Sequence, residues 1–352
     1  MAADENDDVG GRKEGVRRVR REVRDIQDYN LKGHNTFGIE AKCSRFLAFE
    51  SVDEARKVAK ILCELDSPYI IIGGGSNLLL TKDYEGIVVR SDILGFYFDG
   101  NRMTCGSGEV FDEMVEASLM AGLYGLENLS LIPGDVGASA VQNIGAYGVE
   151  AKDYIESIEA VEIATGKVVT IAAEDCRYAY RQSRFKQDWK NKYLITHVTY
   201  RLSTEFKPHL DYGNIREALG MAEPSAQQLR ETIIQIRNAK LPDPKVTGNA
   251  GSFFMNPIVS RETYEQLARQ YEGMPHYEVD SDHVKIPAGW MIDQCGWKGK
   301  SLGRAGVHDK QALVLVNLGG ATGAEIVALC EAIQTDVKAK FGIEIRPEVN
   351  II

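Results

Sequence analysis

The chain has 352 residues, more than one hydrophobic core usually organises, which predicts two or three domains. Apolar residues make up 44% and charged residues 26% of the sequence, which excludes fibrous, collagen-like and globally disordered classes. The formal charge of −10 disfavours general binding to nucleic acid or to anionic membranes, although a local basic pocket is compatible with it.

The six cysteines are scattered without a CxxC pair, and the six histidines form neither HxxxH nor HExxH. We therefore expect reduced thiols and no protein-ligated metal. No apolar run reaches the roughly 18 residues of a membrane span, and the N-terminus lacks the apolar stretch of a secretory signal. These features predict a cytoplasmic protein without a membrane partner. Residues 1–25 run from acidic to basic without a core-forming pattern, and we expect a mobile tail there.

Strands and helices alternate from Arg45 onward. Strand-like runs occur at 45–49, 69–72 and 86–90, and a helix is predicted over 52–65. Further on, two β-rich hairpins are predicted, with turns at 99–101 and 165–166. This order predicts an α/β unit followed by a strand-rich α+β region.

The last third of the chain reads as a further α+β region. A helix is predicted over 225–240 and is stopped by two prolines. It is followed by a strand at 284–286, a short helix opened by Pro287 and a strand at 312–318. Thr322 and Glu325 form a capping box for a final helix. Its predicted buried stripe consists of Ile326, Leu329, Ile333, Val337 and Phe341.

The sequence GGGSN at 73–77 separates two apolar runs. Consecutive glycines allow positive φ and the close approach of a ligand, and the N–H groups of such a turn bind anions. Ser76 and Asn77 add donors, so the loop suits a pyrophosphate. The loop lacks the Lys-Ser/Thr of a P-loop and does not open a helix as GxGxxG does. Taken singly, a tight turn that needs glycine for steric reasons explains it equally well.

A second small-residue segment, 131–148, favours the ligand-binding interpretation of the glycine loop over a purely steric turn. It has neither helix nor strand period, and loops of this length in compact domains are usually functional. Small side chains let the main chain lie against a flat ligand. Two such segments in one region predict a dinucleotide with a planar head, such as a flavin.

A series of collinear motifs resembles the UDP-N-acetylenolpyruvoylglucosamine reductase family, flavoenzymes of bacterial peptidoglycan synthesis. The motifs are NTFGIEA (35–41), IIGGGSNLLL (71–80), GLENLSLIPGDVGASAVQNIGAYG (125–148), CRYAYRQSRFK (176–186), KLPDPKVTGNAGSFFMNP (240–257), AGWMIDQCGWKG (288–299) and IRPEVNII (345–352). The resemblance covers the chain from about Leu31 to its end. Met255 departs from the family pattern, which has a polar residue, often lysine, at that position.

The resemblance implies an α+β fold, with a two-part FAD-binding region of the PCMH/vanillyl-alcohol-oxidase type and a C-terminal α+β substrate-binding domain. The expected bounds are 26–90 and 91–225 for the two FAD-binding parts, 226–346 for the substrate domain, and 347–352 for a strand that returns to the FAD region. A monomer is expected.

The resemblance also implies the reaction. UDP-N-acetylglucosamine enolpyruvate is reduced to UDP-N-acetylmuramate, with non-covalent FAD and with NADPH as co-substrate. Hydride addition at the methylene carbon leaves negative charge next to the carboxylate, so the site must stabilise an enolate and then protonate it.

Three residues are implied as catalytic. Ser252 aligns with the family's proton donor, Arg181 with its catalytic arginine and Glu348 with its catalytic glutamate. A protonated Glu348 would help an enolate most, so we expect a raised pKa there. Without the resemblance these side chains would read as a turn serine, a surface arginine and a solvated carboxylate.

FAD is expected to contact Gly73, Gly74, Gly75, Ser76, Asn77, Leu78, Ile132, Pro133, Gly134, Gly137, Ala138, Gln142, Asn143 and Gly145. The substrate is expected to contact Tyr212, Lys240, Asn256 and Gln311. The segment LDYGNI, which contains Tyr212, resembles the subgroup whose tyrosine loop folds over the substrate and excludes water.

Two alternatives stay open. One is another FAD-dependent oxidase or dehydrogenase of the same fold; such enzymes often tether flavin through His or Cys, and neither glycine segment contains a histidine. The other is a non-catalytic nucleotide-binding protein, whose signature would be the loss of Ser252, Arg181 or Glu348.

Overall fold

The computed structural model describes residues 22–352, so residues 1–21 of the expected tail lie outside the described residues. Strand β1 (Arg24–Asn30) begins at Arg24 and pairs with β2 (Lys42–Phe49), with Arg24 opposite Ala48. The expectation of a tail through residue 25 is therefore wrong for its last two residues, because backbone pairing places them in a sheet.

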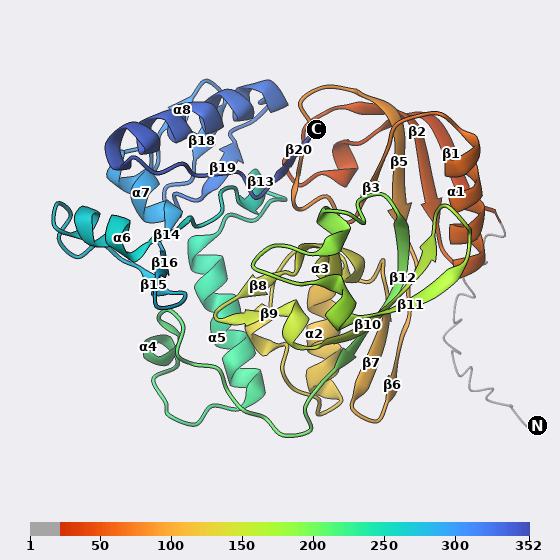
Figure 1. Ribbon diagram of the computed structural model, residues 1–352, viewed down its shortest axis with the longest axis horizontal. Coiled ribbons are helices and arrows are strands. Elements are labelled where there is room, and N and C mark those ends of the chain that lie inside the picture. Colours follow the sequence, from red (N-terminus) through yellow and green to blue (C-terminus); the bar gives the residue numbers. More distant parts are fainter. Residues whose placement is uncertain (1–21) are drawn as a thin grey trace, which may run out of the picture.

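The first sheet has the order β1-β2-β5-β3 and mixes antiparallel and parallel pairs. Strands β3 (Tyr69–Ile72) and β5 (Tyr84–Ser91) match predicted strands. Helix α1 (Val52–Glu64) begins after Ser51, whose hydroxyl accepts the Glu54 N–H. Its buried face packs in a common core with residues of both the first and the second sheet. Figure 1 shows α1 at the outer side of these sheets.

The second sheet is antiparallel, with the order β11-β10-β12-β7-β6. Its strands are β6 (Phe96–Asp99), β7 (Arg102–Gly106), β10 (Ile155–Glu162), β11 (Val168–Ala172) and β12 (Tyr193–Arg201). Both predicted hairpins are confirmed, since β6 pairs with β7 and β10 with β11. Helix α2 (Phe111–Met120) packs in the core of this sheet.

The segment 131–148 contains regular structure that its sequence did not indicate. Helix α3 (Val136–Gln142) lies within it and is followed by β8 (Gly145–Ala146) and β9 (Val149–Glu150). The helix is short, and it buries Val136 and Ala140 in the core of the second sheet. Tertiary burial therefore stabilises a helix too short and too rich in small residues to show a helical period.

The C-terminal unit, residues 248–345, is built around a four-stranded sheet of order β13-β19-β18-β17. Its strands are β13 (Gly248–Ser252), β17 (Ser301–Leu302), β18 (Ala305–Val307) and β19 (Val314–Asn317). A smaller sheet joins β14 (Ile258–Ser260), β15 (Tyr277–Glu278) and β16 (His283–Lys285). Helices α6 (Arg261–Ala268), α7 (Ala288–Gln294) and α8 (Gly323–Phe341) complete the unit.

Local signals predicted α7, α8 and the helix over 225–240, whereas α6 and the short helix before residue 225 were not predicted. Helix α5 (Ala226–Lys240) follows the capping residue Ser225, and the shorter α4 (Ile215–Leu219) precedes it. The capping box of Thr322 and Glu325 is present at the start of α8. All five residues of the predicted stripe on α8 are buried.

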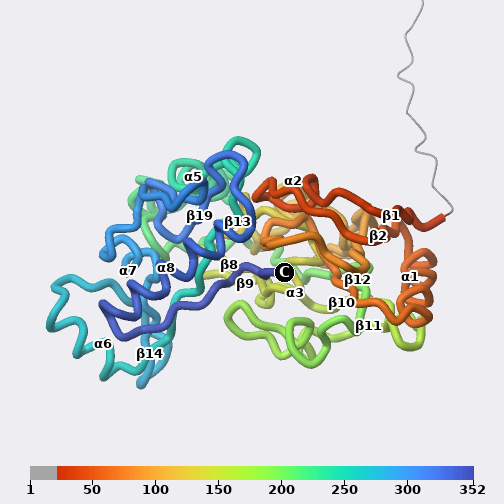
Figure 2. The backbone as a smooth tube through the Cα atoms, turned by 90° about the horizontal axis from the view of Figure 1, so that it is seen from above, coloured from red at the N-terminus to blue at the C-terminus, as the bar shows by residue number. Residues whose placement is uncertain are grey.

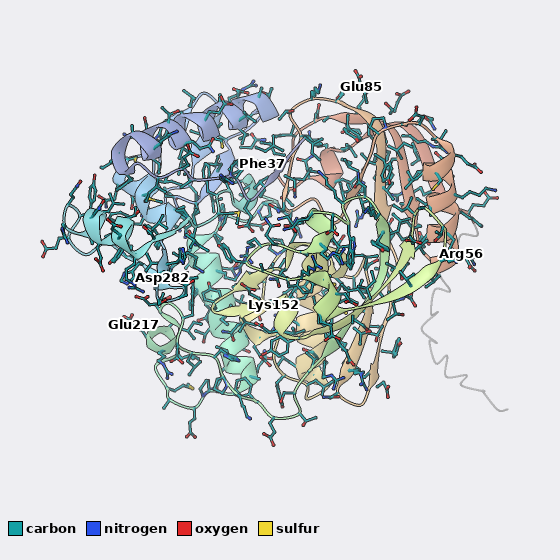
Figure 3. The ribbon with its side chains drawn as sticks, viewed as in Figure 1. Phe37, Arg56, Glu85, Lys152, Glu217 and Asp282 are labelled. Carbon is teal, nitrogen blue, oxygen red and sulfur yellow. The ribbon has the colours of Figure 1, made fainter. Side chains whose placement is uncertain are left out.

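The end of the chain crosses back to the first sheet's side of the molecule. Strand β20 (Asn350–Ile351) pairs in parallel with β4 (Leu78–Leu79), directly after the glycine loop. Figure 2 shows the C-terminus between the two halves of the molecule. The N-terminal part also contributes to the C-terminal unit: Phe37 is 1% exposed and packs in the core of that unit (Figure 3). The β20–β4 pairing and the burial of Phe37 hold the N-terminal and C-terminal parts of the molecule together.

Among residues 22–352, no helix has the length and apolar character needed to cross a bilayer. The same residues hold no group of three or more His, Cys, Asp or Glu side chains placed to bind a metal. All six cysteines are free thiols.

Candidate active site

A cleft of about 1000 Å³ lies where both sheets, α5 and the C-terminal unit meet. Its walls include the glycine loop, the segment 132–147, the hairpin that carries Arg181 and the last five residues of the chain. Every residue expected to contact FAD lines this cleft except Asn143. The two glycine-rich segments therefore form one site.

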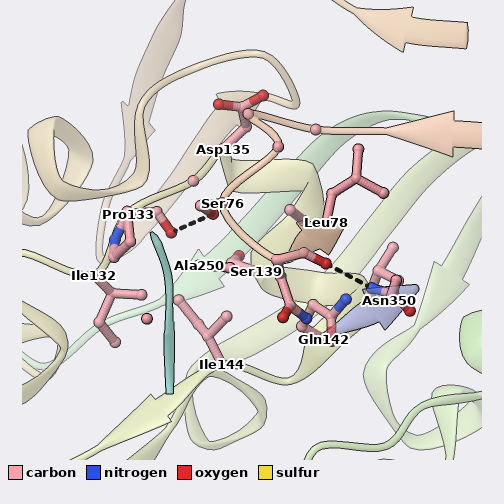
Figure 4. A pocket seen from close by; sticks show the side chains of 18 of the residues that line it. Ser76, Leu78, Ile132, Pro133, Asp135, Ser139, Gln142, Ile144, Ala250 and Asn350 are labelled. Atoms are coloured by element: carbon pink, nitrogen blue, oxygen red, sulfur yellow. Dashed lines mark hydrogen bonds between the residues drawn. The ribbon is translucent and has the colours of Figure 1, made fainter. Parts of the chain in front are cut away.

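The glycine loop needs its glycines for two different reasons. Gly75 has φ +70, and a Cβ there would lie 1.9 Å from the carbonyl oxygen of His34, so the steric explanation holds at this position. At Gly74 a Cβ would lie 3.0 Å from Oδ1 of Asp135, in the second segment. Ser76 Oγ donates to the carbonyl of Pro133 at 3.2 Å (Figure 4). The absence of side chains lets the two segments close on each other and form a narrow, backbone-lined cradle that fits a dinucleotide.

Asn143 does not contribute its side chain to the cleft. It is fully buried with left-handed backbone at the end of α3. Its amide donates to Glu150 Oε2 and to the Ala179 carbonyl at 2.8 Å each, and its Oδ1 accepts the Lys152 N–H at 3.0 Å. All its hydrogen-bonding groups are thus used within the protein, and it supports the hairpin that carries Arg181.

Arg181 lies in a two-residue hairpin turn between Ala179 and Gln182, which exchange two backbone hydrogen bonds of 3.0 Å. Its φ of +55 is left-handed, a conformation that costs a non-glycine residue roughly 1 kcal/mol or more. Nη2 donates to the Gly145 carbonyl at 2.7 Å, and Nε lies 2.8 Å from Oε1 of Glu348. Nε has no aligned hydrogen-bond acceptor, so its contact with Glu348 is an ion pair.

Glu348 reaches this position through the returning C-terminal segment. Its backbone N–H donates to the Phe253 carbonyl at 2.8 Å, which places it beside the strand that ends in Ser252. Burial raises the pKa of Glu348, while the charges of Arg181 and Lys186 act in the opposite direction. The predicted direction of this pKa shift is confirmed.

Ser252 is exposed at the end of β13 and lines the cleft, directly after Gly251, whose φ is +68. Backbone pairing thus brings Ser252 and Glu348 to one wall, and the ion pair adds Arg181. The three residues expected to be catalytic line the same cleft as the two glycine segments.

Three of the four expected substrate contacts line the cleft, namely Tyr212, Lys240 and Gln311. The fourth, Asn256, does not; its Oδ1 accepts the Ala288 N–H at 2.9 Å at the start of α7. The Tyr212 ring stacks on Tyr277 with 5.2 Å between centroids and 9° between planes. This stack joins the loop that contains Tyr212 to the C-terminal unit.

Sequence reasoning missed several charged residues of the site. Lys186 ends the CRYAYRQSRFK motif, and Arg237 precedes Lys240 by three residues, one turn earlier on α5. Burial lowers the pKa of both Lys186 and Arg237. Helical spacing could have found Arg237, since Lys240 lies one turn later on the same helix.

A buried polar network lies beneath the glycine loop. His34 Nδ1 accepts a hydrogen bond from Arg90 Nη1 at 3.0 Å, and its Nε2 forms a hydrogen bond of 3.0 Å with the Tyr29 hydroxyl. Arg90 Nη2 lies 3.8 Å from Oδ2 of Asp135, an oxygen without a hydrogen-bond partner. Burial raises the pKa of Asp135 to about 6 and, together with Arg90, lowers that of His34 to about 4.

Comparison with known proteins identifies the family. The C-terminal domain of UDP-N-acetylenolpyruvoylglucosamine reductase matches residues 243–352, and an FAD binding domain matches residues 44–172. The chain is 54% identical over 332 residues to UDP-N-acetylenolpyruvoylglucosamine reductase of Bacteroides fragilis, covering 93% of this chain and 99% of that protein. Against the enzyme of the same name from Burkholderia multivorans the identity is 43% over 340 residues, with 92% and 95% covered.

A solved structure shows the same fold. The crystal structure of UDP-N-acetylenolpyruvylglucosamine reductase from Thermus caldophilus matches with a TM-score of 0.66 at 22% identity, over 94% of this chain and 98% of that one. The predicted fold class, an FAD-binding region with a C-terminal α+β domain, is confirmed. The chain belongs to the UDP-N-acetylenolpyruvoylglucosamine reductase family.

Proposed function

We propose that the protein reduces UDP-N-acetylglucosamine enolpyruvate to UDP-N-acetylmuramate, with non-covalent FAD and with NADPH as electron donor. The observation that carries this proposal is the meeting of Arg181, Ser252 and Glu348 in one cleft lined by both glycine segments. Family membership supports the same reaction, since this chain matches relatives named UDP-N-acetylenolpyruvoylglucosamine reductase over nearly their whole length.

Residues 73–78 and 132–134, together with Gly137, Ala138, Gln142 and Gly145, would hold the cofactor. When bound, FAD supplies the hydride, taken from NADPH, that reduces the enolpyruvyl double bond. The residues that line the cleft include no histidine and no cysteine, the side chains that tether flavins covalently, and this supports a non-covalent cofactor.

Arg181 binds the substrate carboxylate and stabilises the negative charge that develops next to it. Its guanidinium is pre-organised by the Gly145 carbonyl and by Glu348. A bound substrate carboxylate competes with Glu348 for this cation and adds a negative charge nearby. Both effects favour the protonated form of Glu348, which can then donate a hydrogen bond to the enolate oxygen.

Ser252 donates the proton that completes the reduction. Its hydroxyl is exposed to the cleft, and no side chain stands on Gly251 beside it. A serine hydroxyl is a weak acid, so it serves here because the acceptor is a strongly basic carbon and the donor is fixed in place.

Lys240 and Arg237 supply positive charge on one wall of the cleft, and we assign them to the diphosphate of the substrate. Tyr212 closes over the substrate through its stack on Tyr277. The domain bounds 26–90, 91–225, 226–346 and 347–352 remain part of the same proposal. So do a monomeric enzyme in the cytoplasm and a role in peptidoglycan precursor synthesis, on which cell shape and division depend.

Purified protein tests the proposal. The expected result is a yellow protein that releases FAD on acid denaturation and oxidises NADPH faster when the enolpyruvyl substrate is added. A hydroxy acid or alcohol that reduces the bound flavin, with no response to the enolpyruvyl substrate, would favour the oxidase alternative instead. Colourless protein that also fails to bind added FAD would overturn both enzyme hypotheses.

A further inference from the structure

Lys186 makes contacts that the mechanism above does not use. It ends the 3₁₀ turn Arg184–Lys186 and is half-buried in the wall of the cleft. Its Nζ donates to the backbone carbonyl of Arg181 at 2.9 Å and to Oε1 of Gln142 at 3.2 Å. One ammonium group therefore joins the turn that carries the catalytic arginine to the helix of the second glycine segment.

The carbonyl that Lys186 holds belongs to a strained residue. Arg181 has φ +55, and such a conformation persists only where the surroundings hold it. The two backbone hydrogen bonds between Ala179 and Gln182 close the turn but leave the Arg181 carbonyl free. A charge-assisted hydrogen bond from Lys186 fixes this peptide group, and a shift there would move the guanidinium.

Lys186 also acts electrostatically on Glu348. The groups that act on the Glu348 carboxyl are Arg181, Lys186 and the phenol of Tyr180, so Lys186 supplies one of two cations there. Burial lowers the pKa of Lys186, the charge of Glu348 raises it, and Arg181 lowers it. The half-buried ammonium of Lys186 is repelled by the like charge of Arg181. Its two hydrogen-bond acceptors and the Glu348 carboxylate offset this repulsion.

We infer that Lys186 is a positioning residue for the reduction of the substrate: its ammonium holds the Arg181 turn against Gln142 and sets the charge balance between Arg181 and Glu348. This inference rests on the proposed function. It assigns Lys186 no contact with the reacting atoms. Its main effect is on the second half-reaction, because Arg181 and Glu348 act on the substrate, whereas the contact with Gln142 is one of many that line the cofactor site.

Lys186→Met tests the inference, because methionine keeps the length of the stem and removes the charge and the donors. We expect FAD affinity within about threefold of the unsubstituted protein and nearly unchanged flavin reduction by NADPH. Substrate reduction, followed by stopped-flow flavin absorbance, should fall about 10- to 100-fold. Lys186→Arg keeps the cation and should recover most of that loss.

The pH dependence separates positioning from general loss of structure. Lys186 lowers the pKa of Glu348, so removing the cation raises it. Activity that requires protonated Glu348 is lost as pH rises through its pKa, and the alkaline limb of the rate profile should therefore move to higher pH in Lys186→Met. Lys186→Gln keeps donors for both acceptors without the charge, and it should show the same displacement if the methionine variant does not fold.

Lys192→Met is the matched control, since this exposed lysine lies outside the cleft and should leave both half-reactions unchanged. Unchanged substrate reduction in Lys186→Met would overturn the inference. A fall without displacement of the alkaline limb, or an equal fall in both half-reactions, would also overturn it. Failure of the proposed function is a different result, because the unsubstituted enzyme would then not respond to the enolpyruvyl substrate.

Discussion

Asp112 and Arg230 form a bidentate ion pair that joins α2 to α5. The distances are 2.6 Å from Nη1 to Oδ1 and 3.1 Å from Nη2 to Oδ2, and the Arg230 side chain is 6% exposed. Oδ1 of Asp112 also accepts the N–H of Leu131, whose φ is +58. One carboxylate thus holds the start of the second glycine segment and the helix that ends in Lys240.

Arg230→Met should lower the free energy of unfolding by roughly 3 kcal/mol, because removing one partner leaves a partly buried carboxylate uncompensated. Chemical unfolding followed by circular dichroism measures this change. Arg216→Met is the control, since Arg216 pairs with Asp211 on the surface and should contribute under about 1 kcal/mol. Equal decreases in the free energy of unfolding for the two substitutions would show that the buried Asp112–Arg230 pair stabilises the fold no more than a surface pair.

Gly74→Val should weaken FAD binding. From the sequence, glycine in this loop is expected to let a ligand approach the backbone closely. In the structure, the new Cβ at position 74 points at Asp135 and Gly134, so it separates the two glycine segments and widens the cradle. Overpacking of this kind costs about 1–3 kcal/mol, which corresponds to a roughly 5- to 150-fold higher dissociation constant. Flavin fluorescence titration of the apoprotein measures the constant.

Gly33→Ala is the control for that substitution, because a Cβ at Gly33 meets no atom within 4 Å. FAD affinity should stay the same there. If Gly74→Val bound FAD as tightly as Gly33→Ala, the loop would be a structural turn and the cofactor cradle would have to lie elsewhere.

Asp135 should make stability depend on pH. Its folded pKa is about 6 because of burial, whereas an unfolded aspartate titrates near pH 4. The folded protein therefore binds this proton more tightly, and the stability that Asp135 contributes is complete below about pH 4 and lost as pH rises to about 6. Asp135→Asn removes the titration, so its free energy of unfolding should rise relative to the unsubstituted protein by roughly 3 kcal/mol across this window.

Thermal unfolding of Asp135→Asn at a series of pH values checks this expectation. Glu223→Gln, at an exposed position, should show no such drift. His34 belongs to the same network, and its effect on stability has the opposite pH dependence. Its folded pKa is about 4, below the ordinary 6.5, so the stability that it contributes is lost as pH falls. A constant difference between Asp135→Asn and the unsubstituted protein would rule out titration of Asp135 in this range.

The sequence predicted features that depend on neighbours along the chain. The capping box of α8, the hairpin turns and the stripe of α8 all follow from residues a few positions apart, and all are present. The glycine segments and the residues proposed as catalytic were predicted through motifs. The structure adds that they line one cleft.

The features that the sequence did not predict depend on tertiary contacts. Helix α3 forms because the core of the second sheet covers it. The sequence pattern indicates a loop at Asn143, yet its side chain is fully hydrogen-bonded to partners on two other stretches of the chain, 150–152 and Ala179. Lys186 contacts Gln142 across 44 residues, a pairing that no local pattern encodes.

Tyr212→Ala should open the substrate side of the cleft. The aromatic stack on Tyr277 is lost, and such pairs contribute about 0.5–1.5 kcal/mol, so KM for the enolpyruvyl substrate should rise about 2- to 13-fold. Water and oxygen should also reach the reduced flavin more easily, which raises hydrogen peroxide formation. Tyr212→Phe keeps the ring and should change neither quantity by more than twofold; equal behaviour of the two variants would contradict a lid.

Ser252→Ala tests the proton donor. Flavin reduction by NADPH should be nearly intact, because Ser252 has no part in that step. Substrate reduction should fall about 100- to 10,000-fold, the usual contribution of a positioned proton donor. Stopped-flow absorbance resolves the two half-reactions, and reduction in deuterated water should show whether proton transfer limits the second. An equal loss in both half-reactions would indicate a damaged cleft and would remove Ser252 from the chemistry.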